Sequence, residues 1–180
     1  EGDSDAIVIP ASSDFSFPGD LTIDFWVRPS IIDSSNRMVF ALDNSKLSFR
    51  FYTTTTTYFA ERGTGHATTP PFTLSVNNWY HIAVVRNDGV YTIYFNGLSS
   101  EDTVAEASTS GSSTEPLYIG LRGDMIQPLN GSIDEFRVSK GIARWTANFT
   151  PPAREYNQTY SNLTLQVRSC DDAACSGEIF

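Results

Sequence analysis

The amino-acid sequence predicts an all-β protein built as a two-sheet antiparallel jelly-roll sandwich. Apolar and polar residues alternate with period two in many short runs, which is typical of strands with one buried face. Gly, Pro, Asn, Asp and Ser separate these runs and predict turns between the strands. No stretch of about ten or more residues repeats its apolar positions with the period of a helix.

The predicted strands follow one another along most of the chain. In order they are Ala6–Pro10, Leu21–Arg28, Arg37–Leu42, Lys46–Tyr52, Tyr58–Glu61, Trp79–Arg86, Val90–Phe95, Leu98–Ala105, Leu117–Leu121, Ser132–Ser139 and Leu163–Arg168. The segments Asn87–Gly89 and Asn96–Gly97 suit tight hairpin turns, because Asn, Asp and Gly tolerate the positive φ that such turns require. By contrast, Gly63–Pro71 and Ser108–Pro116 are rich in Gly, Pro, Ser or Thr and are predicted to be loops.

Large apolar side chains from these strands are expected to fill the space between the two sheets. The residues predicted to be buried are Trp26, Trp79, Ile82, Ile93, Phe95, Ile133 and Phe136. Gly141–Pro152 has Ile142, Trp145 and Phe149 among polar residues. It is predicted to be an irregular strap that these apolar side chains hold against the sandwich. His81 is expected to be a hydrogen-bonded structural histidine rather than a catalytic one.

The charge balance argues against two classes of partner. The 180 residues include 12 Lys and Arg against 21 Asp and Glu, which gives a formal net charge of −9 at pH 7. Such a surface repels phosphate backbones and anionic lipids, so we expect neither nucleic acid binding nor membrane insertion. Neutral glycans, divalent cations and basic proteins are compatible partners.

The two cysteines, Cys170 and Cys175, lie close together near the end of the sequence. A local disulfide between them is the favoured interpretation, and it would place the protein in an oxidising compartment outside the cell. A pair of free thiols is the alternative.

Several short motifs occur in an order that resembles a known family. They are Ala6–Pro10, Ser13–Phe17, Leu21–Pro29, Asn78–Arg86, Tyr94–Gly97, Leu117–Gly120, Gly131–Val138 and the closing run Lys140–Pro152. This series resembles the laminin-G-like jelly-roll domains of the concanavalin-A-like lectin and glucanase superfamily. The resemblance implies one such domain over residues 1–155, with residues 156–180 forming a C-terminal strand and a cysteine loop that begin a further module. It also implies an extracellular binding module within a longer, multidomain surface or secreted protein.

The superfamily includes glycoside hydrolases, so a catalytic pair of carboxylates is a possible feature of the sequence. Such enzymes place two carboxylates roughly 5–9.5 Å apart across the scissile bond. On a strand, an E-x-D-x-x-E-like pattern would put such a pair on the concave face, and Glu101, Asp102 and Glu106 have the wrong order for it. Asp134 and Glu135 are adjacent and should point to opposite faces of a strand. We therefore expect no enzymatic activity.

One region combines aromatic rings with polar and charged groups outside the predicted core, as sugar-binding sites do. The expected ligand-binding residues are Tyr52, Tyr58, Glu61, Arg62, His66, Arg122 and Asp124. They favour a carbohydrate-binding or adhesive module whose partner is a glycan. The alternative is a structural or protein-interaction module of a surface or phage-associated protein, in which these are ordinary loop and edge residues.

A calcium ion is the one cofactor that the sequence suggests. Asp134 is expected to share a strand face with Phe136 and Val138, where a lone carboxylate needs compensation. The first and last strands of this fold should be neighbours, so Asp5 and Asp134 are the expected metal ligands, with Asp14 and Asp20 as alternatives. Hydrogen bonds from backbone N–H groups or an Arg would satisfy Asp134 equally well.

Overall fold

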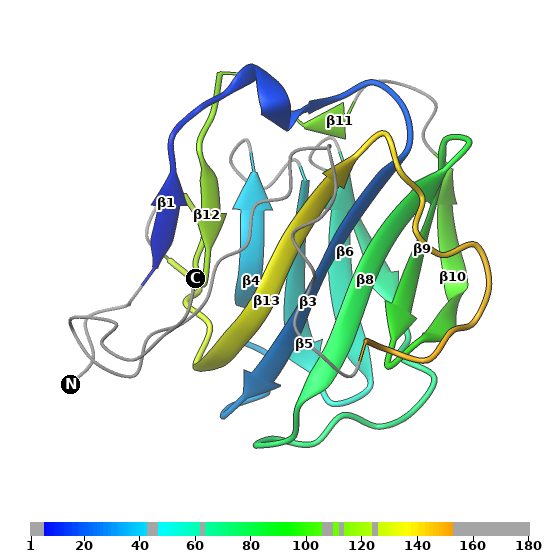
Figure 1. Ribbon diagram of the computed structural model, residues 1–180. Coiled ribbons are helices and arrows are strands. Elements are labelled where there is room, and N and C mark those ends of the chain that lie inside the picture. The colour runs from blue at the N-terminus through cyan, green and yellow to red at the C-terminus, as the bar shows by residue number, and fades with distance from the viewer. Residues whose placement is uncertain are drawn as a thin grey trace.

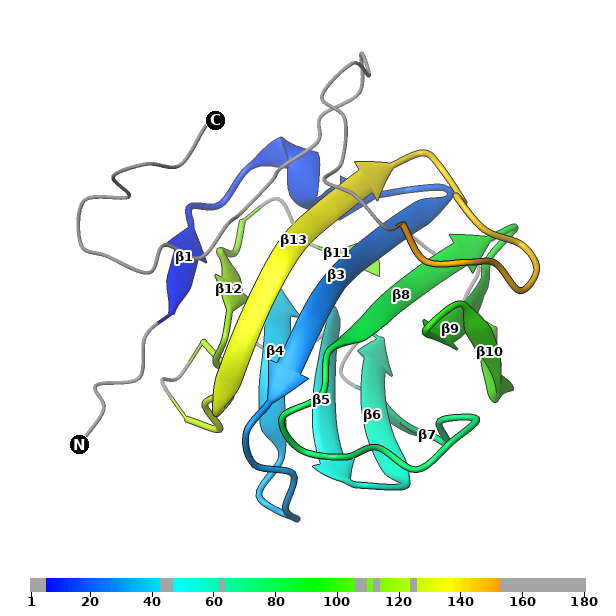
Figure 2. The same cartoon turned by 60° about the horizontal axis from the view of Figure 1, so that its bottom comes forward.

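The protein folds into two antiparallel β-sheets that pack face to face (Figures 1 and 2). The computed structural model describes residues 6–42, 47–61, 64–105, 110–111, 114–123 and 126–152. One sheet has six strands in the order β1-β12-β4-β5-β6-β7, and the other has five in the order β10-β9-β8-β3-β13. This architecture confirms the predicted all-β jelly-roll sandwich.

The strands have the following bounds: β1 Ile7–Ile9, β2 Ser16–Phe17, β3 Leu21–Pro29, β4 Arg37–Leu42, β5 Leu47–Thr53, β6 Thr56–Glu61, β7 Thr64–Thr68, β8 Tyr80–Asn87, β9 Val90–Phe95, β10 Leu98–Ala105, β11 Ser110–Gly111, β12 Leu117–Ile119 and β13 Gly131–Lys140. A 3-10 turn at Ser13–Phe15 is the one helical segment in the described parts of the chain.

Two segments that the sequence predicts to be loops contain short strands instead. Thr64–Thr68 forms β7, which pairs with β6 at the edge of the six-stranded sheet. The Pro-Pro pair begins two residues after β7 ends, so it does not interrupt the ladder. Ser110–Gly111 forms β11 and pairs with β2. The predicted strand Leu163–Arg168 and both cysteines, Cys170 and Cys175, lie outside the described residues.

Both predicted hairpin turns form, and each uses two residues with positive φ. Asp88 and Gly89 have φ of 48° and 78°, and they join the paired residues at the ends of β8 and β9. Asn96 and Gly97 have φ of 50° and 79° between β9 and β10. Positive φ at both central positions matches the twist of the flanking strands.

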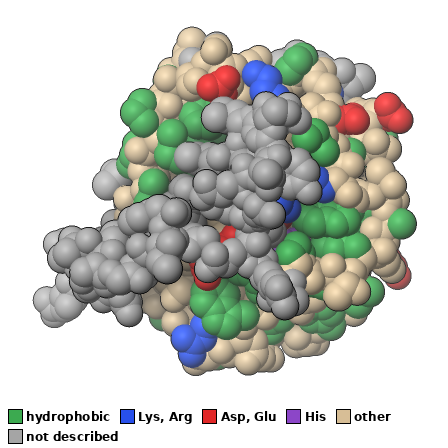
Figure 3. Space-filling model, in the orientation of Figure 1, with side chains coloured by type: hydrophobic (Ala, Val, Ile, Leu, Met, Phe, Trp, Pro, Cys, Tyr) green, Lys and Arg blue, Asp and Glu red, His purple; other side chains and the backbone are tan. Residues whose placement is uncertain are grey.

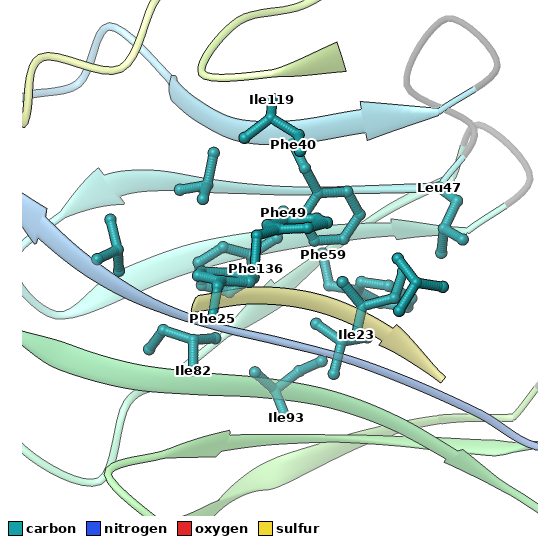
Figure 4. Close-up of a cluster of buried hydrophobic side chains, with 14 of the residues drawn as sticks. Ile23, Phe25, Phe40, Leu47, Phe49, Phe59, Ile82, Ile93, Ile119 and Phe136 are labelled. Carbon is teal, nitrogen blue, oxygen red and sulfur yellow. The ribbon is translucent and has the colours of Figure 1, made fainter. Parts of the chain in front are cut away.

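Alternate residues of each strand turn inward and form one core between the sheets (Figure 4). Phe25 of β3 lies at its centre, stacked on Phe136 of β13 with ring centroids 5.6 Å apart. Phe40 and Phe49 of the opposite sheet meet the Phe25 ring, each at 5.9 Å. Offset and edge-on ring contacts of this kind add to the free energy gained from burial.

Four of the seven residues predicted to be buried lie fully in this core, and Trp79 does not. Ile82, Ile93, Phe95 and Phe136 are at most 2% exposed, whereas Trp79 is 43% exposed. Trp79 precedes Tyr80, where β8 begins, and it has the same parity as His81, which lies on the outer face of the sheet. Here the outer face means the side of a sheet turned away from the core. The two remaining predictions, Trp26 and Ile133, are partly buried.

A β-bulge in β13 changes the face on which Asp134 lies. Asp134 pairs with Trp26, and the register then shifts so that Arg137 pairs with Asp24. Glu135 within the shift has φ of 51°. Because Val27 and Phe25 point into the core, Trp26 and its partner Asp134 lie on the outer face. The prediction that Asp134 shares a face with Phe136 and Val138 is therefore wrong.

Candidate functional site

Three side chains gather on the outer face of the six-stranded sheet, on neighbouring strands β5 and β6. Phe49 and Phe51 of β5 point into the core, so the alternate residues Arg50 and Tyr52 point outward. Tyr58 of β6 pairs with Arg50. The Arg50 guanidinium carbon lies 4.9 Å from the centre of the Tyr58 ring, and the Tyr52 ring meets Tyr58 edge-on at 5.3 Å.

Besides its contact with the Tyr58 ring, the Arg50 side chain is held in place by Asn36. Its Nε donates a hydrogen bond of 3.0 Å to Asn36 Oδ1, and Asn36 lies in the loop before β4 with φ of 56°. Burial lowers the pKa of Arg50, its interaction with Tyr58 raises that pKa, and the nearby charge of Arg122 lowers it. A guanidinium stays protonated under these conditions. The face therefore carries a fixed cation beside two aromatic rings.

The structure brings together some of the predicted ligand-binding residues and separates others. Tyr52 and Tyr58 are in contact, and the charge of Arg122 lowers the pKa of Arg50. His66 of β7 pairs with Phe59, whose ring points into the core, so His66 lies on the opposite side of the sheet from Tyr58. Glu61 is the last residue of β6.

Two further predicted residues, Arg62 and Asp124, lie outside the described residues. The glycine between Arg122 and Asp124 has a packing explanation. A Cβ atom at Gly123 would lie 2.9 Å from the ring of Tyr118, so that ring lies directly against the loop.

Sequence reasoning did not include Arg50 and Asn36 in the site, although Arg50 is central to it. A signal for Arg50 was present, because the alternation along β5 puts Arg50 and Tyr52 on the same face. Asn36 carried no such signal, since its position depends on how the loop before β4 folds back over the sheet.

The outer face of the five-stranded sheet carries a buried polar cluster instead. Arg137 donates two hydrogen bonds to Asp24, of 3.0 and 2.8 Å, and His81 Nε2 lies 3.4 Å from Asp24 Oδ2. Asp24 and His81 are fully buried, and Arg137 is 6% exposed. His81 is thus placed as a structural residue within the cluster.

The strap, residues Gly141–Pro152, covers this cluster. Trp145 and Phe149 stack with ring centroids 4.0 Å apart, and both rings meet His81 edge-on. They pack, together with Ala143, on Ala83, Val85 and Tyr94. The Phe149 N–H also donates to the Gly97 carbonyl at 2.9 Å. The strap predicted from the sequence is confirmed.

The predicted calcium ligands are not brought together by the described residues. The first strand, β1, pairs with β12 rather than with β13, so the expectation that the first and last strands are neighbours is wrong. Asp5 lies outside the described residues. Asp134 Oδ1 accepts a 2.8 Å hydrogen bond from the Glu135 N–H. The alternatives Asp14 and Asp20 are 3.0 Å from Ser12 Oγ and 3.1 Å from the Asp88 N–H.

No group of three or more His, Cys, Asp or Glu side chains that could hold a metal ion occurs in the described parts of the chain. A helix that is long and apolar enough to cross a membrane is likewise not found among the described residues.

A family model described as "Concanavalin A-like lectin/glucanases superfamily", of the laminin G type, matches residues 1–144. The chain belongs to this superfamily. The match covers the sandwich and the first residues of the strap, and it confirms the resemblance that the order of the motifs suggested. A comparison of this concanavalin A-like domain with curated proteins gave no match.

Several solved structures of low sequence identity share the fold of this chain. A heptameric SAP-like pentraxin from Limulus polyphemus has 15% identity and a TM-score of 0.55, with 94% of this chain and 95% of the pentraxin covered. A "putative carbohydrate binding protein" from Bacteroides ovatus has 19% identity and a TM-score of 0.60, with 79% and 43% covered. The concanavalin A-like domain thus spans less than half of the Bacteroides protein.

Domain 4 of AbnA, an extracellular GH43 arabinanase from Geobacillus stearothermophilus solved with arabinotriose, has 17% identity and a TM-score of 0.54. The alignment covers 76% of this chain and 66% of the arabinanase chain.

Proposed function

We propose that this domain is a non-catalytic carbohydrate-binding module, and that its binding surface is the outer face of β5 and β6. The observation that carries the proposal is the fixed group of Arg50, Tyr52 and Tyr58, with Asn36 holding the guanidinium. Aromatic rings stack on the apolar C–H faces of sugars, and a planar guanidinium donates hydrogen bonds to hydroxyl oxygens. Groups that are already in position lose little conformational freedom when a ligand binds.

The composition of this face supports binding without catalysis. A glycoside hydrolase needs two carboxylates about 5–9.5 Å apart. Glu61, the last residue of β6, is the one Asp or Glu in the sequences of β4, β5, β6 and β7, so these four strands do not supply a carboxylate pair. The relatives described as a carbohydrate binding protein and as an arabinanase domain bound to arabinotriose lend the proposal further support.

The proposal includes the setting of the module. We infer that it is exported from the cell, that it is one part of a longer surface or secreted protein, and that Cys170 and Cys175 form a disulfide there. A count of free thiols under non-reducing, denaturing conditions tests the disulfide. No free thiol is expected, and two would contradict it.

A glycan array followed by calorimetry tests the binding function. Saturable binding of a glycan is expected, and Tyr58→Ala should raise its Kd about tenfold or more, because both the ring and the support of Arg50 are lost. Tyr58→Phe keeps the ring and should retain most of the affinity. Arg50→Gln should weaken binding, whereas Arg37→Gln is the matched control, since Arg37 on the same sheet is paired with Asp33.

Two results would contradict the proposal. An unchanged Kd in Tyr58→Ala, with correct folding shown by circular dichroism, would mean that the glycan does not bind on the outer face of β5 and β6. No binding to any neutral or acidic glycan on the array would favour the structural or protein-interaction module.

Calcium binding by Asp5 and Asp134 stays a prediction. A bound ion stabilises the native state by about 2.7 kcal/mol at a hundredfold excess over its Kd. Melting should then rise by several degrees from EDTA to millimolar calcium, and Asp134→Ala should abolish that rise. Identical melting curves would mean that Asp134 binds no calcium and that its carboxylate is satisfied by the hydrogen bond from the Glu135 N–H.

A further inference from the structure

The strap covers only part of the outer face of the five-stranded sheet. It packs on Ala83 and Val85 of β8 and on Tyr94 of β9, and Figure 1 shows it in orange on that side of the sheet. Toward the end of β3, the described residues Arg28 and Trp79 are exposed. Figure 3 views this face and shows hydrophobic, basic and acidic side chains close together at its lower end.

Strand register places the side chains at this end of the face in two rows across the sheet. In one row, Trp26 of β3 lies between His81 of β8 and Asp134 of β13. In the next row, Arg28 pairs with Ser132. The paired residues Val27 and Tyr80 place Trp79 beside Arg28 on the other side.

Trp79 is the unusual member of this group. It is 43% exposed, and it is the one aromatic residue among the exposed large hydrophobic side chains that the structure describes. The other aromatic rings of the described chain are buried or half-buried. An exposed indole in the residue directly before β8 has no role in the core. Exposed aromatic rings are common in binding surfaces.

The polar groups around the two indoles are held in place. Arg28 Nε donates a 3.0 Å hydrogen bond to the Asn77 carbonyl, and the Asn77 N–H donates at 2.7 Å to the carbonyl of Pro29, next to Arg28. Asp134 is oriented by the Glu135 N–H at 2.8 Å. The Trp26 ring rests edge-on against His81, with centroids 5.3 Å apart. This group is therefore preorganised on the sheet rather than carried by a loose loop.

We propose that Trp79, Trp26, Arg28 and Asp134 form a second carbohydrate-binding site, which takes a neutral pyranose residue. A pyranose chair presents a flat C–H face that suits an indole ring. Arg28 donates hydrogen bonds to the sugar hydroxyls, and Asp134 accepts them. Because one cation and one anion lie on the same face, an acidic sugar would be attracted by one group and repelled by the other, which favours an uncharged ligand.

This site is on the opposite sheet from Arg50 and Tyr58, so the domain would bind two sugar residues that lie on opposite sides of the sandwich. The inference shares with the proposed function only the class of ligand, and the two sites are separable by mutation.

The test is an NMR titration of the full 180-residue chain with cellotriose, xylotriose and mannotriose. The protein has three tryptophans, so three indole N–H signals report on Trp26, Trp79 and Trp145. At least one trisaccharide should shift the signals of Trp79 and Trp26 in a saturable way. The signal of Trp145, which is stacked on Phe149 under the strap, should not move.

Variants then assign the site. Trp79→Ala and Asp134→Asn should each raise the Kd from the remaining indole shifts about tenfold or more, while Tyr58→Ala leaves it unchanged. Val76→Ala is the matched control, because Val76 lies three residues before Trp79 and has the same 43% exposure. Trp79→Phe keeps an aromatic ring and should bind with intermediate affinity.

The outcomes separate the two sites. Binding that Tyr58→Ala abolishes and Trp79→Ala leaves intact would overturn the second site and leave the first. The reverse result would support the second site and remove the first. If none of the three trisaccharides shifts the Trp79 and Trp26 signals, the second site is wrong, whatever the array shows for the first.

Discussion

At the scale of single residues, the buried ion pair of Asp24 and Arg137 beneath the strap depends most on exact geometry. Asp24 is fully buried and its carboxylate accepts two hydrogen bonds from Arg137. Burying two charges is costly unless geometry and hydrogen bonding compensate for the lost hydration. The bulge in β13 provides that geometry, since the register shift brings Arg137 directly opposite Asp24.

The substitution Asp24→Asn tests how much this pair matters. It would remove the negative charge that pairs with the buried Arg137 guanidinium in two hydrogen bonds, so the free energy of unfolding should fall by about 3–5 kcal/mol. Urea denaturation followed by tryptophan fluorescence measures the change. The matched control is Asp33→Asn at the exposed pair with Arg37, which should alter stability little. Equal changes in the free energy of unfolding would mean that the buried pair stabilises the fold no more than the exposed pair does.

At the scale of elements, the strap depends on the tight turn between β9 and β10. The Gly97 carbonyl accepts the Phe149 N–H, and the Asn148 side chain accepts the N–H of Ser99 at 2.9 Å. A Cβ atom at Gly97 would collide with the carbonyl group of Phe149. The glycine is therefore needed both for its positive φ and for the close approach of the strap.

Gly97→Ala should detach the strap from this turn. Gly141→Ala is the matched control, because Gly141 has a similar φ of 76° but nothing lies within 4 Å of the added methyl group. The control should cost only the strain of the left-handed backbone, about 1–2 kcal/mol. Gly97→Ala should cost more and should speed hydrogen exchange at the Phe149 amide. Equal melting temperatures and equal exchange rates would show that the contact does not hold the strap.

Most elements could be predicted from the sequence because period-two alternation and turn residues act locally. The hairpin at Asp88–Gly89 is one such case. The bulge at Glu135 could not be predicted in this way, since it depends on the partner strand, and a single extra residue moved Asp134 to the other face. The candidate site was predicted only in part, because strand pairing decides which face a side chain lies on. Tyr52 and Tyr58 were found by residue type, but the position of His66 depends on the register of β7.

At the scale of the whole molecule, the sandwich is closed by contacts between distant parts of the sequence. Lys140 of β13 pairs with Leu21 of β3, and Ile7 of β1 pairs with Ile119 of β12. Neither sheet can be completed until most of the chain is present. Phe25, near the centre of the core, stacks on Phe136 of that last strand.

Truncation tests the predicted domain boundary. A chain of residues 1–155 should unfold cooperatively, with a melting temperature close to that of the 180-residue chain. A chain that ends at Asn130 is the control, and it should not fold, because β3 would lose its partner β13 and the core would lose Phe136. A 1–155 chain without a cooperative transition would show that residues 156–180 belong to the same folding unit.

The unequal attachment of the first and last described segments has a mechanical consequence. β1 is held at the edge of its sheet by three residue pairs with β12, whereas β13 pairs with β3 along eight positions and the strap beyond it is pinned by stacked rings. If the domain is stretched between residues 6 and 152, β1 should peel away at low force while the sandwich stays intact. The short first strand would then extend under load before either of the two proposed binding sites is disturbed.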